Sequence, residues 1–472
     1  MEGINPVVQS QVSPVGGMPS GGQVPPPPQR NLKKPLLIVV GVLILAILGF
    51  LAYRFVLPMF GGGAREQTIT WWGLWEDEAV VAPLIAEYTQ ANPKAKIEYV
   101  KQSPQDYRER LTNALAKGTG PDIFRFHNSW VPMFVSELDS LPAEVMSQTE
   151  FSQTFYPVIL SDLTTTNGVV GLPIGFDTLA LYINEEIFEK NGKSVPRTWD
   201  DLRQTAIELT IKDEKGKIEQ AGVALGRTEN VDHWQEILAL MMLQNGVRMT
   251  NPTGDLAEVA LTYYTIFSSV DGVWDKTLPP STVAFANGKL AMYFAPSWRI
   301  FEIKNANPSL KFKVVPVPQL AKDKPTDPDV TYATYWVEGV WKRSENRQAA
   351  WNFLKFLSTQ EAQQKLYQNA TTQRAIGEPY PRVDMLPTLA QDPLAGAFVS
   401  QGGTAKSWYL ASRTFDGPTG INSQINAYFA DAVNAVNSGE RAAEALAVAA
   451  QGVNQVLSNY ELVAPLGTPS SR

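Results

Sequence analysis

The sequence of 472 residues contains no cysteine and two histidines, His127 and His233. The absence of cysteine excludes disulfides, thiolate catalysis, cysteine-bound metals and lipid attachment through a cysteine. With so few histidines we also expect no metal site and no cofactor. Asp and Glu (47) outnumber Lys and Arg (40), and no basic patch is visible in the sequence. Nucleic acid is therefore not expected as a partner.

The first 57 residues differ in composition from the rest of the chain. Residues 1–34 are rich in Pro, Gly, Ser and Gln and end in PPPPQRNLKK. They have too few apolar residues to order themselves, so we expect a disordered tail, which is favoured over a polyproline docking site at residues 25–28. Residues 35–57 follow as a long apolar stretch, with no charged residue from Leu36 to Tyr53.

The stretch 35–57 is long enough to cross a bilayer as a helix. Arg30, Lys33 and Lys34 precede it, which predicts a cytoplasmic N-terminus and a C-terminal part outside the cell. A cleavable signal peptide is the alternative. The long tail in front, the length of the apolar core and the lack of an A-x-A site favour an uncleaved single-pass anchor. Residues 58–67, with three consecutive glycines, are expected to be a linker.

From Ile69 onward, apolar stretches with strand and helix periodicity alternate, which predicts an α/β protein large enough for two domains. The segment Gly171–Leu202 has the clearest local signals. Thr198 and Asp201 form a capping-box pattern, and Leu202, Ala206 and Leu209 follow on one helical face. Gly192 stands where the preceding helix, 185–190, should end.

This segment also carries a resemblance to a known family, the solute-binding proteins of ABC importers of the maltose-binding-protein type. Their pattern is matched in order and spacing by the following residues: Gly171, Pro173, Tyr182, Asn184, Phe188, Gly192, Pro196, Thr198, Trp199, Asp200 and Leu202. Three further stretches resemble the same family: Gly120–Ile123, FANGKLAMYFAPSW at 285–298, and Ser344 to Gln363. The resemblance covers roughly residues 68–460.

The resemblance implies a two-lobed periplasmic-binding-protein-like fold of type II, with a hinge and a cleft between the lobes. It implies three crossings between lobes, which we place near Asp177, near 315–318 and near 341–344. Lobe 1 would then comprise 68–176 and 318–343, and lobe 2 would comprise 177–317 and 344–463. We expect residues 464–472 to be a frayed tail.

Ligands in open α/β sheets bind beyond the carboxyl ends of strands. Aromatic residues with polar neighbours recur at those positions, and sugars combine C–H faces that stack on indoles with hydroxyls that bind carboxylates, amides and Arg. The candidate ligand-binding residues are Trp72, Trp75, Glu76, His127, Asn128, Asp177, Trp298, Arg299, Tyr335, Trp336, Trp408 and Arg413. For Asp177 and Trp298 the family resemblance adds support.

Some aromatic and titratable residues have a structural explanation that competes with ligand binding. Trp199 and Trp351 fall on helices, so core packing is favoured for both. Of Trp72 and Trp75, one is expected to line the cleft and the other to pack. His127 is balanced between a ligand contact and a hydrogen-bonded loop residue, and His233 is favoured as structural.

The leading hypothesis is a membrane-anchored receptor, expected to be a monomer, that captures a mono- or oligosaccharide between its lobes and delivers it to ABC transporter permease subunits. No catalytic residue is assigned. A glycoside-active enzyme is one alternative, because Glu76, Asp177 and Glu338 could supply a carboxylate pair. A sensor or adhesin that is not coupled to transport is another, suggested by the Pro-rich tail.

Overall fold

The computed structural model describes residues 45–50, 66–322, 324 and 326–463. Residues 45–50 are helical and exposed, and the chain from Glu66 onward forms a separate compact unit. Within the described ranges, no helix has both the length and the apolar character needed to span a bilayer. Most of the expected anchor (35–57) and linker, and all of the tails 1–34 and 464–472, lie outside the described residues.

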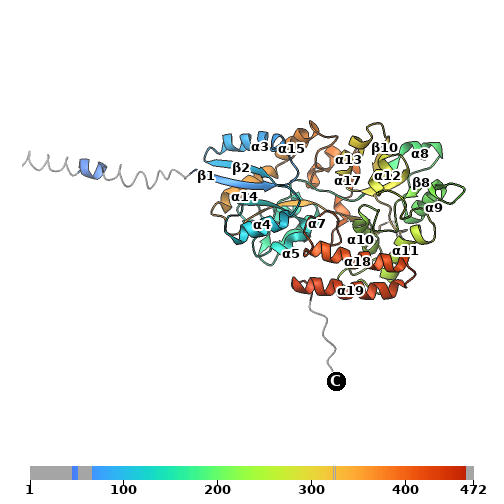
Figure 1. Cartoon of the computed structure of the whole chain (residues 1–472). Helices are drawn as coiled ribbons and strands as arrows, with labels where there is room; N and C mark the ends of the chain where they lie inside the picture. Colours follow the sequence, from blue (N-terminus) through green and yellow to red (C-terminus); the bar gives the residue numbers. More distant parts are fainter. Residues whose placement is uncertain (1–44, 51–65, 323, 325, 464–472) are drawn as a thin grey trace, which may run out of the picture. The chain divides into compact units, whose positions relative to one another are not determined.

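The first lobe is built on a four-stranded sheet with the order β12-β3-β1-β2 (Figure 1). β1, β2 and β3 are parallel, and β12 is antiparallel to β3. The strands are β1 (Gln67–Gly73), β2 (Ala95–Lys101), β3 (Ile123–His127) and β12 (Trp336–Val340). The helices packed around them are α3 (Glu78–Ala91), α4 (Tyr107–Ala116), η2 (Asn128–Trp130), α5 (Val131–Phe134), α6 (Gln148–Thr154), α7 (Pro157–Leu163), α14 (Arg347–Leu357) and α15 (Gln360–Thr371).

The second lobe is built on a five-stranded sheet with the order β10-β6-β9-β8-β7. Its strands are β6 (Ala180–Asn184), β7 (Ile211–Lys212), β8 (Ile218–Val223), β9 (Leu290–Ala295) and β10 (Phe312–Val315). Its helices are α8 (Glu185–Lys190), α9 (Trp199–Leu209), α10 (Trp234–Gln244), α11 (Asp255–Ser269), α12 (Ser281–Ala286), α13 (Arg299–Ala306), η3 (Val383–Met385), α16 (Leu386–Leu389), α17 (Gly396–Ser400), α18 (Ile421–Asn437) and α19 (Ala442–Asn459). Each lobe has its own apolar core.

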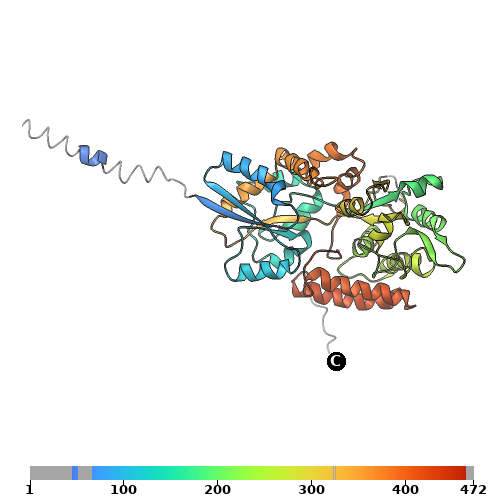
Figure 2. The same cartoon turned by 45° about the horizontal axis from the view of Figure 1, so that its top comes forward.

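Short strands and turns complete the unit. β4 (Thr164–Thr165) pairs with β5 (Gly168–Val169), and β11 (Thr331–Tyr332) pairs with β13 (Ala405–Lys406). A last short turn, η4 (Gly402–Thr404), precedes β13. Two antiparallel helices, α18 and α19, run together along one side of the unit in both views (Figures 1 and 2). The structure confirms the predicted α/β architecture with two lobes.

The assignment of all of 344–463 to the second lobe was wrong for α14 and α15. Phe353 of α14 packs on Trp71 and on Tyr88, with ring centroids 5.6 and 5.0 Å apart, and α14 and α15 belong to the first core. After α15 the chain returns to the second core at Ile376 and Tyr380, so the third crossing lies after α15 and not near 341–344. The apolar stripe of α14 showed that one face is buried, but not which core buries it.

Two of the segments between the lobes run side by side. Leu172 bridges Glu338, and Thr178 bridges Ala333, both antiparallel. Gly171 permits this close approach, because a Cβ there would lie 2.4 Å from Val337 Cγ1. The predicted capping box of Thr198 and Asp201 is present at the start of α9, and Gly192 has φ of +60° just after α8.

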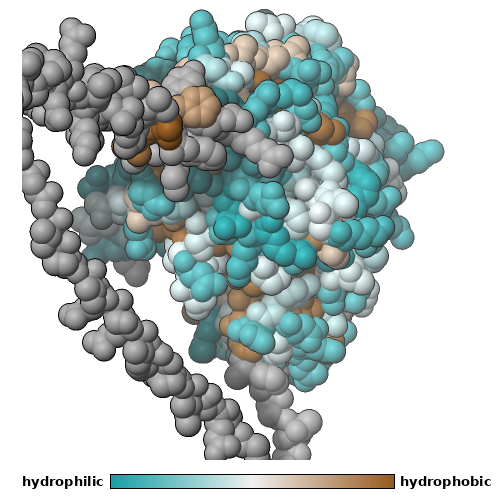
Figure 3. Space-filling view, turned by 90° about the vertical axis from the view of Figure 1, so that its left-hand side faces the viewer, coloured by the Kyte–Doolittle hydropathy of each residue, from teal (hydrophilic) through white to brown (hydrophobic). Residues whose placement is uncertain are grey.

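The part of the first lobe that is visible in Figure 3 shows no large apolar patch. The side of the unit that carries β1 and β2 is mostly hydrophilic, with isolated hydrophobic spots (Figure 3). The exposed large apolar residues of the first lobe include Val100 and Val135. Scattered apolar side chains are normal on a folded domain, so they do not by themselves mark an interaction site.

Candidate functional site

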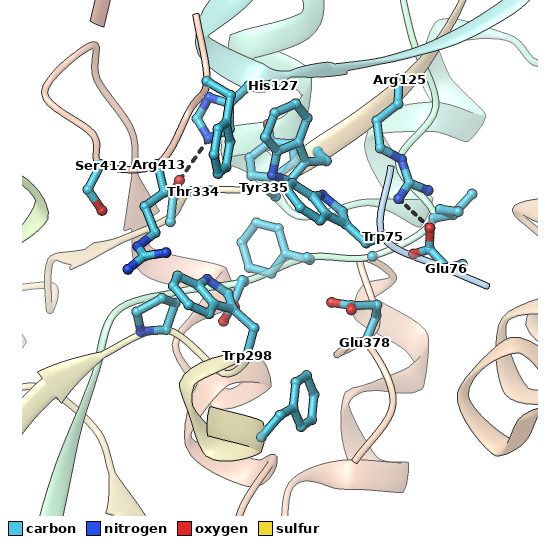
Figure 4. A pocket seen from close by; sticks show the side chains of 18 of the residues that line it. Trp75, Glu76, Arg125, His127, Trp298, Thr334, Tyr335, Glu378, Ser412 and Arg413 are labelled. Atoms are coloured by element: carbon cyan, nitrogen blue, oxygen red, sulfur yellow. Dashed lines mark hydrogen bonds and ion pairs between the residues drawn. The ribbon is translucent and has the colours of Figure 1, made fainter. Parts of the chain in front are cut away.

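A cavity of about 380 Å³ lies where residues of both lobes meet (Figure 4). Its volume falls within the range of about 300–1,000 Å³ that is typical of small-molecule sites. Eight of the predicted residues line it: Trp75, Glu76, His127, Asp177, Trp298, Tyr335, Trp336 and Arg413. The lining residues that were not proposed as ligand contacts are Arg125, Ile174, Gly175, Phe176, His233, Glu236, Pro296, Phe301, Glu302, Thr334, Arg374, Glu378, Ser412 and Phe415.

Four predicted residues do not line the cavity. Trp72 packs against the first core, and Trp408 packs against the second. Asn128 is buried, and both polar atoms of its side chain bind other protein groups. Its Nδ2 donates to the Asp162 carboxylate, and its Oδ1 accepts from the backbone N–H of Tyr335. Arg299 is buried and bound to His233 and Glu302. The pattern of strand ends could not separate these residues from the lining residues, because neighbours in sequence point to opposite sides.

Aromatic rings form one wall of the cavity. Trp75 follows β1 and meets Trp336, the first residue of β12, edge to face with ring centroids 5.4 Å apart. Phe415 approaches Trp75 at 5.7 Å, and His127 meets Trp336 at 5.2 Å. Both tryptophans are half-buried. Such rings offer flat apolar faces together with N–H groups, a combination that suits a ligand with C–H faces and hydroxyls.

Trp298 forms part of the opposite wall, and it is covered by cations. The Cζ atom of Arg299 lies 4.4 Å from the Trp298 ring centroid, and that of Arg413 lies 5.3 Å from it. Arg299 is buried outside the cavity lining, whereas Arg413 is exposed and lines it. The guanidinium of Arg413 therefore covers the indole on its cavity side.

A buried charge network supports the aromatic wall. Arg125, in the middle of β3, forms ion pairs with Glu76 and Glu338. Glu338 stands opposite Arg125 in the register of β12 and β3, and it also accepts from Trp71 Nε1 at 3.1 Å. Burial alone would lower the pKa of Arg125, but Glu338 and Glu76 together hold it above its ordinary value. Burial raises the pKa of Glu338, and Arg125 opposes that rise.

Asp177 joins the crossing segment to the end of β9. Its carboxylate accepts from the Ser297 amide at 2.9 Å, from the Ser297 hydroxyl at 2.8 Å and from the Thr178 amide at 2.9 Å. Burial raises the pKa of Asp177, while the hydrogen bonds from Ser297 oppose the rise. Most of the acceptor capacity of this carboxylate is thus used to hold Trp298, one residue beyond Ser297, in the cavity wall.

His127 is buried and hydrogen-bonded at both ring nitrogens. Nδ1 lies 2.7 Å from the Ser129 hydroxyl and Nε2 lies 2.9 Å from the Thr334 hydroxyl. Burial lowers its pKa to about 3, although the negative charge of Glu236 acts in the opposite direction. His127 is therefore neutral at physiological pH and orients Thr334 at the cavity.

The far side of the cavity carries two further polar groups. Glu236 and His233 both hold Ser412, and burial lowers the pKa of His233 despite the nearby Glu236 carboxylate. Arg374 forms an ion pair with Glu378 at 2.8 Å. Gly175 makes room for Glu378, because a Cβ at Gly175 would lie 3.0 Å from Glu378 Cβ.

One of the missed residues, Arg125, left a signal in the sequence together with its partner Glu338. Arg125 is the single charged residue of the strand IFRFH, and Glu338 that of WVEGV. A buried charge needs a partner, so opposite charges in two apolar strands predict that those strands pair. Phe415, Ser412 and Glu378 lie in irregular or turn-rich stretches, where no periodicity marks them. Among the described residues, no group of His, Asp and Glu side chains is placed to hold a metal ion.

Comparison with known proteins gives a consistent result. A sequence profile of the bacterial extracellular solute-binding proteins matches residues 83–395. A binding protein of Brucella abortus is 26% identical over 270 residues, which are 55% of this chain and 64% of the relative. The maltotriose-binding protein of Pyrococcus abyssi is 23% identical over 307 residues, 62% of each chain. The cyclic alpha-maltosyl-1,6-maltose binding protein of Arthrobacter globiformis superimposes with a TM-score of 0.67 at 18% identity, covering 83% of this chain and 99% of that one.

Proposed function

Since the chain belongs to the bacterial extracellular solute-binding proteins, we propose that it captures a carbohydrate between its two lobes and delivers it to the permease of an ABC transporter. The observation that carries the proposal is the cavity in which Trp75, Trp336, Trp298 and Phe415 are combined with hydrogen-bonding groups. The names of two similar proteins support a sugar as the ligand: one is a maltotriose-binding protein and the other a cyclic alpha-maltosyl-1,6-maltose binding protein.

The mechanism follows from the placement of the lining residues on both lobes. Trp75, His127 and Trp336 belong to the first lobe, and Trp298 and Phe301 belong to the second. A ligand that contacts both walls binds the closed arrangement better than an open one, and so it favours closure. Release to a permease then requires the lobes to separate again.

The glycoside-active alternative has less support from the geometry. Hydrolysis needs two carboxylates that face the scissile bond. Glu76 and Glu338 are both engaged by Arg125, and Glu338 is fully buried. Asp177 already accepts hydrogen bonds from Ser297 and Thr178. The three carboxylates therefore hold the cavity wall in place and are not free to act as a catalytic pair.

We further propose that residues 35–57 anchor the protein in the membrane as a monomer, with residues 1–34 in the cytoplasm and the two lobes outside. Limited proteolysis of intact cells tests this arrangement. Protease should digest the lobes and leave a membrane-bound N-terminal fragment. Mass spectrometry that finds a mature N-terminus beyond residue 57 would instead show a cleaved signal.

The sugar proposal is tested by following tryptophan fluorescence during titration with glucose, maltose, maltotriose and larger maltodextrins, with amino acids as the opposing panel. Sugars should change the emission, because three tryptophans line the cavity. A Trp75→Phe variant should lose much of the response, and a Trp72→Phe variant should retain it. A response to amino acids and none to sugars would overturn the assignment.

A further inference from the structure

The segment 412–422 brings two side chains to the cavity from a strained backbone. Arg413 and Phe415 both line the cavity, and both have left-handed backbone conformations, with φ of 51° and 54°. Such values are uncommon for residues other than glycine, and they persist only when surrounding contacts hold them. Contacts at both ends hold this segment, and Arg108 of α4 adds a hydrogen bond to the Thr419 hydroxyl at 2.7 Å between them.

The first end is fixed to the second lobe. The backbone N–H and the hydroxyl of Ser412 donate to Glu236 Oε1 at 2.6 and 2.8 Å. His233 Nδ1 lies 3.0 Å from the same hydroxyl. Glu236 and His233 are buried at the start of α10, so Ser412 moves with the second lobe.

The other end is fixed to the first lobe through Asn422, which is fully buried in the first turn of α18. Its Oδ1 accepts from the hydroxyl of Ser129 at 2.8 Å, and Ser129 lies in η2, the turn that follows β3. Its Nδ2 donates to the Tyr409 carbonyl at 2.8 Å, and its backbone N–H donates to Asp416 Oδ2 at 2.7 Å. Asn422 therefore ties the first lobe, through the buried Ser129, to the segment that carries Arg413 and Phe415.

We propose that residues 412–422 form a strap that couples the two lobes at the cavity, with Asn422 as the positioning residue that sets where Arg413 and Phe415 stand. The proposal rests on the proposed function only in taking the cavity as the ligand site. Removal of the Asn422 side chain takes the donor from the Tyr409 carbonyl and the acceptor from the Ser129 hydroxyl, which keeps its contact with His127. The strained residues between the anchors are then free to relax, and the displacement reaches Ser412.

The two histidines of the chain report on the two ends of the strap. His127 Nδ1 bonds the Ser129 hydroxyl, which bonds Asn422. His233 Nδ1 bonds the Ser412 hydroxyl. Since the sequence has no other histidine, imidazole nitrogen NMR of ¹⁵N-histidine-labelled, untagged full-length protein gives one pair of ring-nitrogen signals, Nδ1 and Nε2, for each anchor. Replacement of each histidine by Gln in turn assigns the signals.

The experiment compares the wild type with Asn422→Ala, Asn422→Asp and Asn437→Ala, without any sugar. Asn437 is a matched control at the other end of α18, where its Nδ2 donates to the Gly226 carbonyl at 2.7 Å. Asn422→Ala should shift both histidine signals, Asn422→Asp should restore the His127 signal because it keeps an acceptor for Ser129, and Asn437→Ala should shift neither.

Coupling is overturned if Asn422→Ala shifts His127 and leaves His233 unchanged, or if Asn437→Ala shifts both equally. Should Asn422→Ala fail to fold, Ser129→Ala breaks the same anchor from the first-lobe side, and a shift of His233 remains the required result. Because no sugar is present, failure here leaves the sugar titration intact, and a silent sugar titration leaves this result intact.

Discussion

The guanidinium of Arg413 lies over the indole of Trp298, with 5.3 Å between its Cζ atom and the ring centroid. Trp298 was predicted to contact ligand because of its place in the sequence, but the cavity side of its ring is occupied by this side chain. A sugar that stacks on Trp298 must therefore displace Arg413.

Replacement of Arg413 by Ala should tighten sugar binding. An exposed cation–π contact contributes about 0.5–1 kcal/mol, which corresponds to a roughly two- to fivefold lower Kd. Isothermal titration calorimetry with a sugar from the fluorescence panel measures the change. Arg343→Ala is the matched control, because Arg343 lies 5.0 Å from the Trp341 ring centroid and outside the cavity lining. Weaker binding by Arg413→Ala would show instead that the guanidinium binds the sugar directly.

Substitution of Trp75 and substitution of Trp72 should have different effects on the Kd for sugar. Trp75 lines the cavity and Trp72 does not, although they are three residues apart. Trp75→Leu should raise the Kd for sugar at least about tenfold, as expected for an aromatic residue at the centre of a contact. Trp72→Leu should leave the Kd within about twofold and affect mainly the thermal midpoint. Equal losses of affinity in both variants would contradict the assignment of the wall.

Arg125 should be important for stability. Its removal leaves Glu76 and Glu338 buried without a counter-charge, so Arg125→Met should cost about 3–5 kcal/mol. Urea unfolding followed by circular dichroism measures the shift. The control is Arg203→Met, whose partly exposed ion pair with Asp271 should contribute no more than about 1 kcal/mol. Equal shifts would mean that the buried network does not support the first lobe.

His127 should make stability depend on pH below neutrality. Burial lowers its pKa to about 3 in the folded protein, from an ordinary value of 6.5. The unfolded chain therefore binds the proton more tightly. Its contribution is fully present above about pH 6.5 and falls as the pH drops toward about 3, with a loss of about 2 kcal/mol by pH 5. The His127→Gln variant should lose less stability than the wild type between pH 7 and pH 5. NMR titration that finds His127 protonated at pH 5 would contradict this.

Much of the fold could be predicted because local signals agreed with the tertiary structure. Thr198 and Asp201 cap α9 as their spacing indicated, and Gly192 adopts the positive φ expected after a helix. The place of α14 could not be predicted in the same way. Its stripe of Ala350, Phe353 and Leu357 requires a buried face, but two cores were available, and only the contact of Phe353 with Trp71 decides between them.

Most of the correctly predicted lining residues lie at or near the end of a regular strand. Trp75, His127 and Trp336 adjoin β1, β3 and β12. Arg299, by contrast, belongs to the start of a helix whose first two residues are buried. Phe415, which was not predicted, reaches the cavity from a residue with a left-handed backbone in an irregular segment. No periodicity in the sequence encodes such an arrangement.

The most direct test of the account is a crystal structure of the protein with a sugar that changes its tryptophan fluorescence. The account predicts a sugar ring in the cavity, stacked on Trp75 or Trp336, with residues of both lobes in contact with it. A sugar bound elsewhere on the surface, with this cavity unoccupied, would contradict it.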